Sequence, residues 1–179
     1  MFPLPFDLDQ ASHLALVGLP FSGKSTTANF LSKALARKVI STDALICEKS
    51  GLTIEEWFSL KGELAFRKME REVLHELLGG NEPLIIDTGG GLPCFYDNME
   101  YLCQSATVIW LDTAPAVLAA RSLLHADRPL LLGLAPDLTK RTEYFSILRL
   151  ERMPFYSKAS WIYRTDGHTQ ERWIRTSSE

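Results

Sequence analysis

The chain has 179 residues, of which 46% are hydrophobic and 23% are charged, and its formal net charge is −3. These values are typical of an ordinary globular domain with a sizeable core, and they argue against a surface that coats nucleic acid. The three cysteines form no C-x-x-C pair and no apolar run reaches the length of a membrane span, so we expect reduced thiols in a cytoplasmic protein without a membrane segment.

The predicted elements alternate between short apolar strands and helices. Residues 1–12 contain prolines, lack the basic and long apolar stretches of a signal peptide, and predict a surface lead-in. Short apolar runs predict strands at 13–17, 38–41, 83–87, 106–111 and 160–164. Helical spacing predicts helices at 24–36, 42–49, 53–58, 63–78, 95–103, 114–123 and 139–153, and a short one at 168–176. Thr53 begins a capping box, and Pro154 marks the end of the long helix or a kink in it.

Strands that alternate with helices predict βαβ units and a parallel sheet. We therefore expect an α/β fold of three layers, α/β/α, around a central parallel sheet of about five strands. No linker is long enough to divide the chain, so a single domain over 1–179 is expected. Right-handed crossovers would bring the carboxyl ends of the strands to one edge, where open α/β folds bind their ligands.

A phosphate-binding loop is predicted where the first strand meets the first helix. Residues 18–26 match G-x-x-x-x-G-K-[ST] with the strand before it and the helix after it that this motif requires. Gly18 and Gly23 let the backbone turn tightly around an anion, while Lys24 would reach the β- and γ-phosphates and Ser25 would ligate Mg²⁺. The residues predicted to bind the nucleotide phosphates are Gly18, Ser22, Gly23, Lys24, Ser25 and Thr26. The alternative is an ordinary strand-to-helix turn with a chance Lys-Ser pair.

Asp87 is the candidate for a second acid directed at Mg²⁺. It ends an apolar strand, which is where a phosphate-loop protein keeps this acid, and the contact can pass through water because Mg²⁺ retains part of its hydration shell. The alternative is that Asp87 caps the turn at Thr88 or Gly89.

Three consecutive glycines, Gly89, Gly90 and Gly91, follow this strand. Such a run costs conformational entropy, which a plain turn rarely requires. Close approach of the backbone to a small ligand is the favoured interpretation, and a flexible loop is the alternative.

Three arginines are candidates for anion binding. Arg67 and Glu70 lie three residues apart and can pair on one helix face, although such a pair alone is more often a solvated ion pair. Arg128 precedes Pro-Leu-Leu, and Arg152 precedes Met-Pro-Phe-Tyr. Guanidinium groups bind carboxylates and phosphates through two parallel hydrogen bonds, so the three arginines are able to form a clamp. Their spacing alone does not establish one.

Together these stretches resemble the shikimate kinase family, small phosphate-loop kinases of the nucleoside-monophosphate-kinase structural group. The resemblance runs from about residue 13 to residue 165. It rests on GLPFSGKST at 18–26, STDALICEKSGLTIEEWF at 41–58, GELAFRKMERE at 62–72, DTGGGLP at 87–93, VIWLDTAPAVLAAR at 108–121, RPLL at 128–131 and ERMPFY at 151–156. A very large group of proteins shares the phosphate loop, whereas the ordered set of GE-x-x-FR-x-x-E, GGG, RPLL and R-x-P-x-Y is far more specific.

The resemblance implies a substrate site on helices at about 42–78 and on the glycine run. Asp43 looks like the aspartate that accepts hydrogen bonds from shikimate hydroxyls and takes the proton of the attacking one. Arg67 and Arg152 look like the arginines that hold the shikimate carboxylate, with Glu70 orienting Arg67. Gly89, Gly90 and Gly91 match the backbone loop against the substrate, and Phe58 and Phe66 match its apolar walls.

The resemblance also implies a nucleotide site for ATP. Arg121 looks like the arginine whose plane covers adenine. Arg128 would reach over the transferring phosphate from a mobile lid at about 124–138. The family usually has an acid-x-Asp pair where this chain has Ser41-Thr42-Asp43, so Ser41 replaces the acid that is tied to the Mg²⁺ water shell. We therefore expect Asp87 and Ser25 to hold the metal.

The function implied is ATP-dependent phosphorylation of shikimate at its 3-hydroxyl by a cytoplasmic monomer that uses Mg²⁺ and binds neither nucleic acid nor membrane. One alternative is a kinase for another small sugar acid such as gluconate, because an arginine clamp also fits other carboxylated polyols. A second is a non-catalytic nucleotide-binding relative, which the serine at position 41 motivates.

Overall fold

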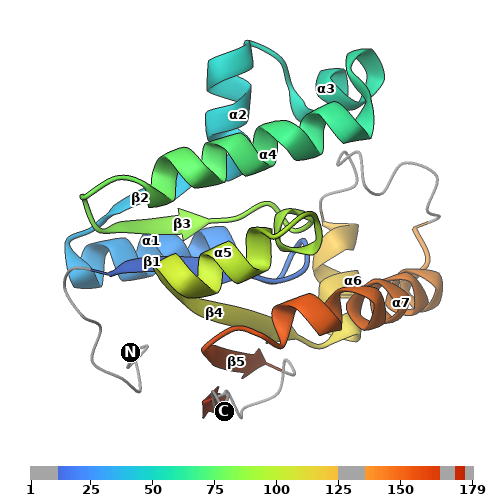
Figure 1. The fold of residues 1–179 in the computed structure, drawn as a ribbon. Coiled ribbons are helices and arrows are strands. Elements are labelled where there is room, and N and C mark those ends of the chain that lie inside the picture. Colours follow the sequence, from blue (N-terminus) through green and yellow to red (C-terminus); the bar gives the residue numbers. More distant parts are fainter. Residues whose placement is uncertain (1–11, 125–135, 166–171, 176–179) are drawn as a thin grey trace.

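A six-stranded sheet forms the centre of the computed structural model within its described residues, 12–124, 136–165 and 172–175 (Figure 1). Its strands are β1 (His13–Val17), β2 (Lys38–Ser41), β3 (Leu84–Asp87), β4 (Ala106–Thr113), β5 (Trp161–Thr165) and β6 (Arg172–Arg175). Their order is β2-β3-β1-β4-β5-β6, in which the first five strands are parallel and β6 is antiparallel to β5. The predicted five-stranded parallel sheet is therefore present, with one antiparallel strand added at its edge.

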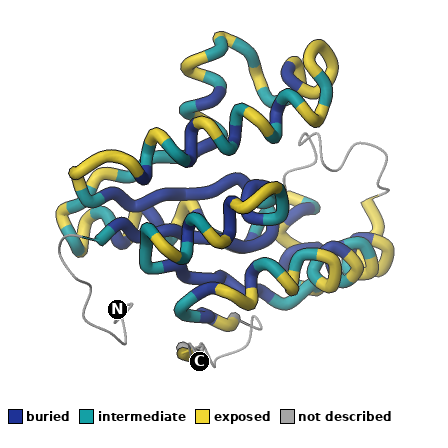
Figure 2. The backbone as a smooth tube through the Cα atoms, in the orientation of Figure 1, coloured by how far each residue is buried: buried dark blue, intermediate teal, exposed yellow. Residues whose placement is uncertain are grey.

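Helices cover both faces of the sheet and give the predicted three layers. They are α1 (Lys24–Leu35), α2 (Thr42–Ser50), α3 (Ile54–Leu60), α4 (Gly62–Leu78), the 3₁₀ turn η1 (Leu92–Cys94), α5 (Asn98–Ser105), α6 (Pro115–Leu123) and α7 (Leu138–Tyr156). Successive side chains of β1 point to opposite faces. Leu14 and Leu16 pack in a core cluster with α1, whereas Ala15 and Val17 pack in a cluster to which α4, α5, α6 and α7 contribute. Figure 2 shows the strands buried between these layers.

Helices α2, α3 and α4 form a subassembly beside β2, at the top of Figure 1. It has its own small core of Ile46, Trp57, Phe66 and Val73. The predicted capping box is present, because the Thr53 hydroxyl accepts from the Glu56 amide and the Glu56 carboxylate accepts from the Thr53 amide. This cap fixes where α3, the helix that carries Phe58, begins.

The prediction of a helix at the C-terminal end of the chain is wrong. Residues Arg172–Arg175 form β6, and they pair with β5 from Trp161↔Arg175 to Arg164↔Arg172. Trp173 and Ile174 favour strands, and the edge of β5 offers unpaired backbone groups. Long-range pairing with β5 therefore decides the conformation of this segment.

Helix α7 also continues beyond the predicted end at Met153 and reaches Tyr156, with Pro154 inside its last turn. A proline removes one N–H from a helix, here the one that would donate to the Leu150 carbonyl, but the helix can continue because later amides still pair. The Ser157 amide donates to the Met153 carbonyl at 2.9 Å. The extra turn carries Tyr156 into the core.

The strand register brings the carboxyl ends of β1, β2 and β3 together. Leu16 of β1 and Ser41 of β2 both lie opposite Asp87, the last residue of β3. The phosphate loop, α2 and the glycine run each begin at this edge, as the topology predicts. Among the described helices, none combines the length and apolar character needed to cross a membrane.

Candidate active site

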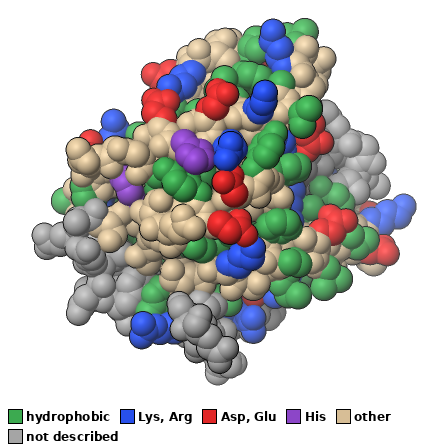
Figure 3. All heavy atoms as spheres, viewed as in Figure 1, with side chains coloured by type: hydrophobic (Ala, Val, Ile, Leu, Met, Phe, Trp, Pro, Cys, Tyr) green, Lys and Arg blue, Asp and Glu red, His purple; other side chains and the backbone are tan. Residues whose placement is uncertain are grey.

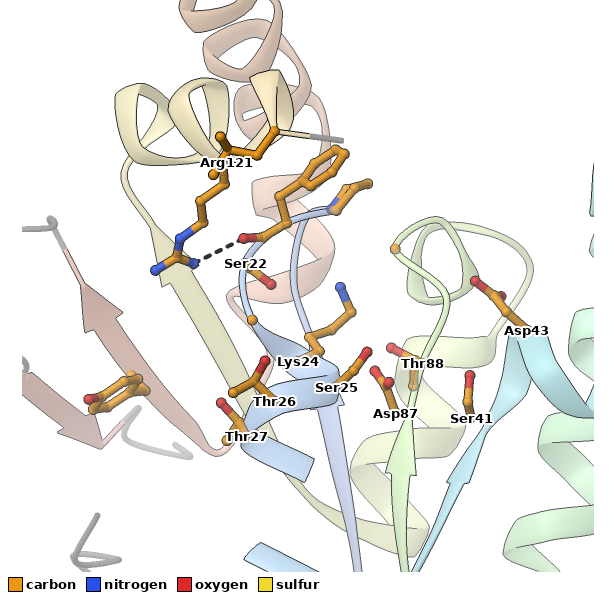
Figure 4. A pocket seen from close by; sticks show the side chains of 16 residues that line it. Ser22, Lys24, Ser25, Thr26, Thr27, Ser41, Asp43, Asp87, Thr88 and Arg121 are labelled. Carbon is orange, nitrogen blue, oxygen red and sulfur yellow. Dashed lines mark hydrogen bonds between the residues drawn. The ribbon is translucent and has the colours of Figure 1, made fainter. Parts of the chain in front are cut away.

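A cavity of about 790 Å³ lies at this edge of the sheet, beside the phosphate loop (Figure 4). Nine of its lining residues are among those predicted from the sequence, namely Ser22, Gly23, Lys24, Ser25, Thr26, Asp43, Asp87, Gly90 and Arg121. The other lining residues are Pro20, Phe21, Thr27, Ser41, Thr88, Leu124 and Tyr163. One cavity therefore contains both the predicted phosphate site and part of the predicted substrate site.

The phosphate loop has the backbone that its glycines allow. Gly18 has a φ of 148° and Gly23 a φ of 93°, both in the region that favours glycine. A Cβ on Gly18 would lie 2.8 Å from the carbonyl oxygen of Leu111, so β4 also packs too closely for a larger residue. Phe21 adopts a φ of 66° as well, and nothing in its residue type predicted this. These backbone conformations fit the predicted phosphate loop.

Lys24 is 8% exposed and points into the cavity (Figure 4). Its Nζ donates to the carbonyl oxygens of Gly18 and Leu19, each at 3.0 Å. Ser25 and Thr26, which follow it at the start of α1, are exposed to the same cavity. The start of a helix, an ammonium group and two hydroxyls thus face one space, and this arrangement suits a polyphosphate.

Arg121 of α6 lies against the same loop. Its Nη1 donates to the carbonyl oxygen of Phe21 at 3.0 Å, the dashed line in Figure 4. It lies on the side of the loop away from Asp43 and Asp87 (Figure 4).

Asp87 is 7% exposed, and its carboxylate lines the cavity near Ser25 (Figure 4). The alternative that it caps the following turn is wrong, because those amides have other acceptors. The Thr88 amide donates to the Leu16 carbonyl at 3.3 Å, and the Gly89 amide donates to the Thr42 hydroxyl at 2.8 Å. The Asp87 carboxylate is therefore not committed to the turn.

Ser41 faces Asp87 in the strand register, and its hydroxyl accepts from the Ala44 amide at 3.4 Å as the cap of α2.

The hydroxyl of Ser25 and the carboxylate of Asp87 are oxygen ligands of the kind that Mg²⁺ prefers. Among the described residues no group of three or more His, Cys, Asp or Glu gathers around one point. A Mg²⁺ site that takes one or two protein oxygens and several phosphate oxygens needs no such group.

Arg67 and Glu70 form the expected ion pair, and it is not a solvated surface pair. Arg67 Nη1 lies 2.7 Å from Glu70 Oε2, and the two side chains are 11% and 1% exposed. On its other edge, Arg67 donates from Nε and Nη2 to the half-exposed carboxylate of Glu63 at 3.2 and 3.0 Å. The guanidinium also lies over the ring of Phe95, 4.1 Å from its centroid. It is thus fixed at several points beside the cavity.

Burial raises the pKa of Glu70 to about 7, and the adjacent Arg67 guanidinium opposes this rise. A buried carboxylate stays ionised only if a positive group lies close to it. Glu70 therefore depends on Arg67 for its charge as much as Arg67 depends on Glu70 for its orientation.

The three glycines are needed for space and not for backbone freedom. None of them has a positive φ; the described glycines that do are Gly18, Gly23, Gly51 and Gly62. A Cβ on Gly89 would lie 2.5 Å from Asp43 Oδ1, and one on Gly91 would lie 2.6 Å from Arg67 Nη1. Because the three glycines lack side chains, Asp43 and Arg67, two of the predicted substrate-binding residues, can lie against their backbone. The Gly89 amide and the Gly90 carbonyl are hydrogen-bonded, which favours close approach over the flexible-loop alternative.

Gly91→Ala is expected to raise the KM for the acceptor substrate by about 10- to 100-fold, because the added Cβ displaces the guanidinium of Arg67 and small misplacements are costly. The thermal midpoint should also fall, because displacing Arg67 weakens its ion pair with the buried carboxylate of Glu70. Gly80→Ala is the matched control, because its Cβ would meet only the Leu77 carbonyl at 3.4 Å. Steady-state kinetics and thermal melts of both variants test this, and an unchanged KM for Gly91→Ala would contradict it.

The predicted substrate residues from different elements converge on the glycine run. Gly89 adjoins Asp43 and Glu70, Gly91 adjoins Arg67, and Arg152 donates from Nη1 to the Gly90 carbonyl at 2.8 Å. Arg67, Gly89, Gly91 and Arg152 do not line the cavity, but Gly89 adjoins Asp43 and Arg152 adjoins Gly90, which do. Arg128 and most of the predicted lid at 124–138 lie outside the described residues.

Sequence reasoning missed several residues at the site. Thr42 and Tyr156 hold the glycine run in place, and Phe95 lies under Arg67. Tyr156 belongs to the R-x-P-x-Y stretch, so its position in the motif was the available signal. No comparable pattern marks Thr42 or Phe95, because their contacts depend on chain segments that are distant in the sequence.

Comparisons with known proteins agree on one family. The sequence model of the shikimate kinase family matches residues 20–178. A shikimate kinase of Bacteroides fragilis is 39% identical over 164 residues, which cover 90% of this chain and 89% of the relative. A shikimate kinase of Phocaeicola vulgatus is 33% identical over 167 residues, which cover 93% of this chain and 94% of the relative.

Solved structures give the same result. The crystal structure of shikimate kinase from Bacteroides thetaiotaomicron matches with a TM-score of 0.79 and 34% identity, and the match covers 86% of each chain. The structure of shikimate kinase from Acinetobacter baumannii in complex with shikimate matches with a TM-score of 0.79 and 30% identity, covering 88% of this chain and 86% of the other.

Proposed function

The chain belongs to the shikimate kinase family, and we propose that it transfers the γ-phosphoryl group of ATP to the 3-hydroxyl of shikimate. The observation that carries this proposal is one cavity lined by the phosphate loop, Asp43 and Gly90, with Arg152 hydrogen-bonded to Gly90 and Arg67 against the neighbouring Gly91. Shikimate has a carboxylate and three hydroxyls, which match two arginines and a carboxylate acceptor. A relative with 30% identity has been solved in complex with shikimate.

In the proposed reaction the 3-hydroxyl oxygen bonds to the γ-phosphorus, and the bond from that phosphorus to the β–γ bridging oxygen breaks. ADP leaves, and the hydroxyl proton passes to the Asp43 carboxylate. Asp43 lies in the first turn of α2, beside Gly89 and in the same cavity as the phosphate loop. Phosphoryl transfer needs positioning and charge neutralisation more than covalent catalysis, and Lys24 would supply part of this charge.

Arg67 and Arg152 would hold the substrate carboxylate. A guanidinium has five N–H donors in a planar fork, so each arginine can keep its protein contacts and still donate to a carboxylate. Fixing the carboxylate fixes the ring and so places one hydroxyl toward the γ-phosphate. Arg128 is proposed to add positive charge over the transferring group.

Mg²⁺ is the proposed metal, with the Ser25 hydroxyl and the Asp87 carboxylate as its protein ligands. Both line the cavity beside the phosphate loop, and their oxygens suit this ion. When bound with ATP, the ion neutralises charge on the β- and γ-phosphates. Ser41 is proposed to have no direct part, since its hydroxyl caps α2.

Asp87→Asn is expected to raise the Mg²⁺ concentration that gives half-maximal activity by about 10- to 100-fold, because it removes the charged ligand. Ser41→Ala should change this concentration less than about twofold, since it removes only a weak helix cap at 3.4 Å. Magnesium titrations of activity, together with calorimetric titration of Mg²⁺ and ADP, measure both variants. Equal and small effects would mean that the metal contact lies elsewhere.

We further propose a monomeric, single-domain, cytoplasmic enzyme without nucleic-acid partners. The support is the continuous sheet, the free cysteines and the mixed surface charge. Figure 3 shows acidic and basic side chains interspersed on one face. Several of the described ones pair, as in Lys49–Glu76 and Arg71–Asp97.

A coupled assay of ADP release, run with shikimate and separately with gluconate, tests the proposed function. We expect turnover that depends on shikimate and on Mg²⁺·ATP. Faster turnover with gluconate would favour a kinase for another sugar acid. Binding of Mg²⁺·ATP without transfer to any of a panel of polyols would favour a non-catalytic relative.

A further inference from the structure

Two side chains of α7 converge on the carbonyl oxygen of Gly90. The Tyr156 hydroxyl donates to it at 2.5 Å, and Arg152 Nη1 donates to it at 2.8 Å. The two residues lie four positions apart and therefore share one face of the helix. A carbonyl oxygen has two lone pairs, so both donors can be accepted at once. Gly90 thus ties the glycine run to the helix that carries Arg152.

Tyr156 is held rigidly. Its side chain is fully buried, and its ring packs against Trp110 with centroids 5.8 Å apart. Burial raises the pKa of its hydroxyl, so the group stays protonated and can donate. A buried phenol must hydrogen-bond to avoid a desolvation penalty, and Gly90 provides its acceptor.

Gly90 is also close to the phosphate loop. A Cβ on Gly90 would lie 3.1 Å from Cδ of Pro20 and 3.3 Å from Arg152 Nη1. The residue therefore lies between the loop that would hold the donor phosphate and the arginine that would hold the acceptor carboxylate. Any shift of its carbonyl changes the position of Arg152 relative to the phosphate loop.

We propose that Tyr156 is a positioning residue, which acts on shikimate binding by fixing the Gly90 carbonyl and, through it, the guanidinium of Arg152. This rests on the proposed function. Tyr156 touches no reacting atom. With the carbonyl fixed, one N–H of Arg152 is directed to Gly90, and the rest of its planar fork has a defined orientation toward the substrate carboxylate. Without the hydroxyl, Gly90 and Arg152 can move together.

The test is Tyr156→Phe, which removes one oxygen and keeps the ring against Trp110. The Gly90 carbonyl still accepts from Arg152, so no buried polar group loses its last partner and the fold is retained. We expect the KM for shikimate to rise about 3- to 10-fold, which corresponds to the loss of one hydrogen bond. The KM for ATP and kcat should stay within about twofold of the original. Tyr101→Phe is the control, because that ring stacks on His75 away from the site.

A double-mutant cycle separates positioning from general loosening. If Tyr156 acts through Arg152, then adding Tyr156→Phe to Arg152→Ala causes no further rise in the KM for shikimate. Additive effects would overturn the proposal, as would equal rises in the KM for shikimate and for ATP. Turnover of shikimate with an unchanged KM in Tyr156→Phe would overturn this inference alone. No turnover by the original chain would overturn the proposed function and the inference with it.

Discussion

Asp43→Asn is expected to lower kcat by about 10²- to 10⁴-fold, the usual contribution of a general base, while the KM for ATP changes little. Asparagine has nearly the same shape and still accepts hydrogen bonds from hydroxyls, but it does not take the proton of the attacking one. Asp43 lines the cavity from the first turn of α2, and its Oδ1 lies 2.5 Å from where a Cβ on Gly89 would be. It is therefore placed beside the glycine run, where we propose that the acceptor binds.

The matched control for this variant is Asp97→Asn. Asp97 is also an aspartate, but it pairs with Arg71 on the surface, with 57% of the Asp97 side chain exposed. Pre-steady-state measurement of ADP formation gives the rate of the chemical step for both variants. A kcat for Asp43→Asn within about threefold of the original would mean that another group takes the proton.

Much of the fold was predictable because it depends on local patterns. The apolar runs of β1 and β3 are buried completely, and such runs predict parallel strands. The phosphate loop was predictable for a similar reason, since Gly18 and Gly23 are required by the local backbone. Parallel strands then place Asp87 and Ser41 at one edge through the crossover rule alone.

Features that depend on distant segments were not predictable in the same way. β6 is a strand because the edge of β5 is available, which no local pattern of residues 172–175 reveals. The glycine run illustrates the same limit. Its composition indicated close approach, but the approaching atoms belong to Asp43 and Arg67, which precede it by more than twenty residues.

The ion pair of Arg67 and Glu70 shows why burial decides function. Spacing on a helix predicts that the two side chains meet, but it is the same spacing as in many surface pairs. This pair is buried only because Phe95 and the glycine run pack over it. A buried, oriented guanidinium binds a carboxylate more strongly than a solvated one because less water competes.

Arg67→Ala is therefore expected to raise the KM for shikimate by about 10- to 150-fold, the range for losing hydrogen bonds to a charged group, with a smaller change in the KM for ATP. Part of the effect comes from Glu70, which would remain buried without its positive partner and take up a proton near neutral pH. The pKa of that carboxyl is already raised to about 7 by burial, and removal of Arg67 removes the charge that opposes this rise.

Arg71→Ala provides the control on the same helix, one turn later. Arg71 also pairs with a carboxylate, at 2.9 Å from Asp97, but its side chain is 44% exposed, so its removal should leave both KM values unchanged.

Arg67→Lys distinguishes charge from geometry, because a lysine keeps the charge but not the planar fork that reaches Glu63 and Glu70 together. If Arg67 binds the carboxylate through its fork, Arg67→Lys should resemble Arg67→Ala in the KM for shikimate. Full activity of Arg67→Lys would mean that Arg67 contributes only its positive charge. An unchanged KM for shikimate in Arg67→Ala would mean that Arg67 does not bind the substrate.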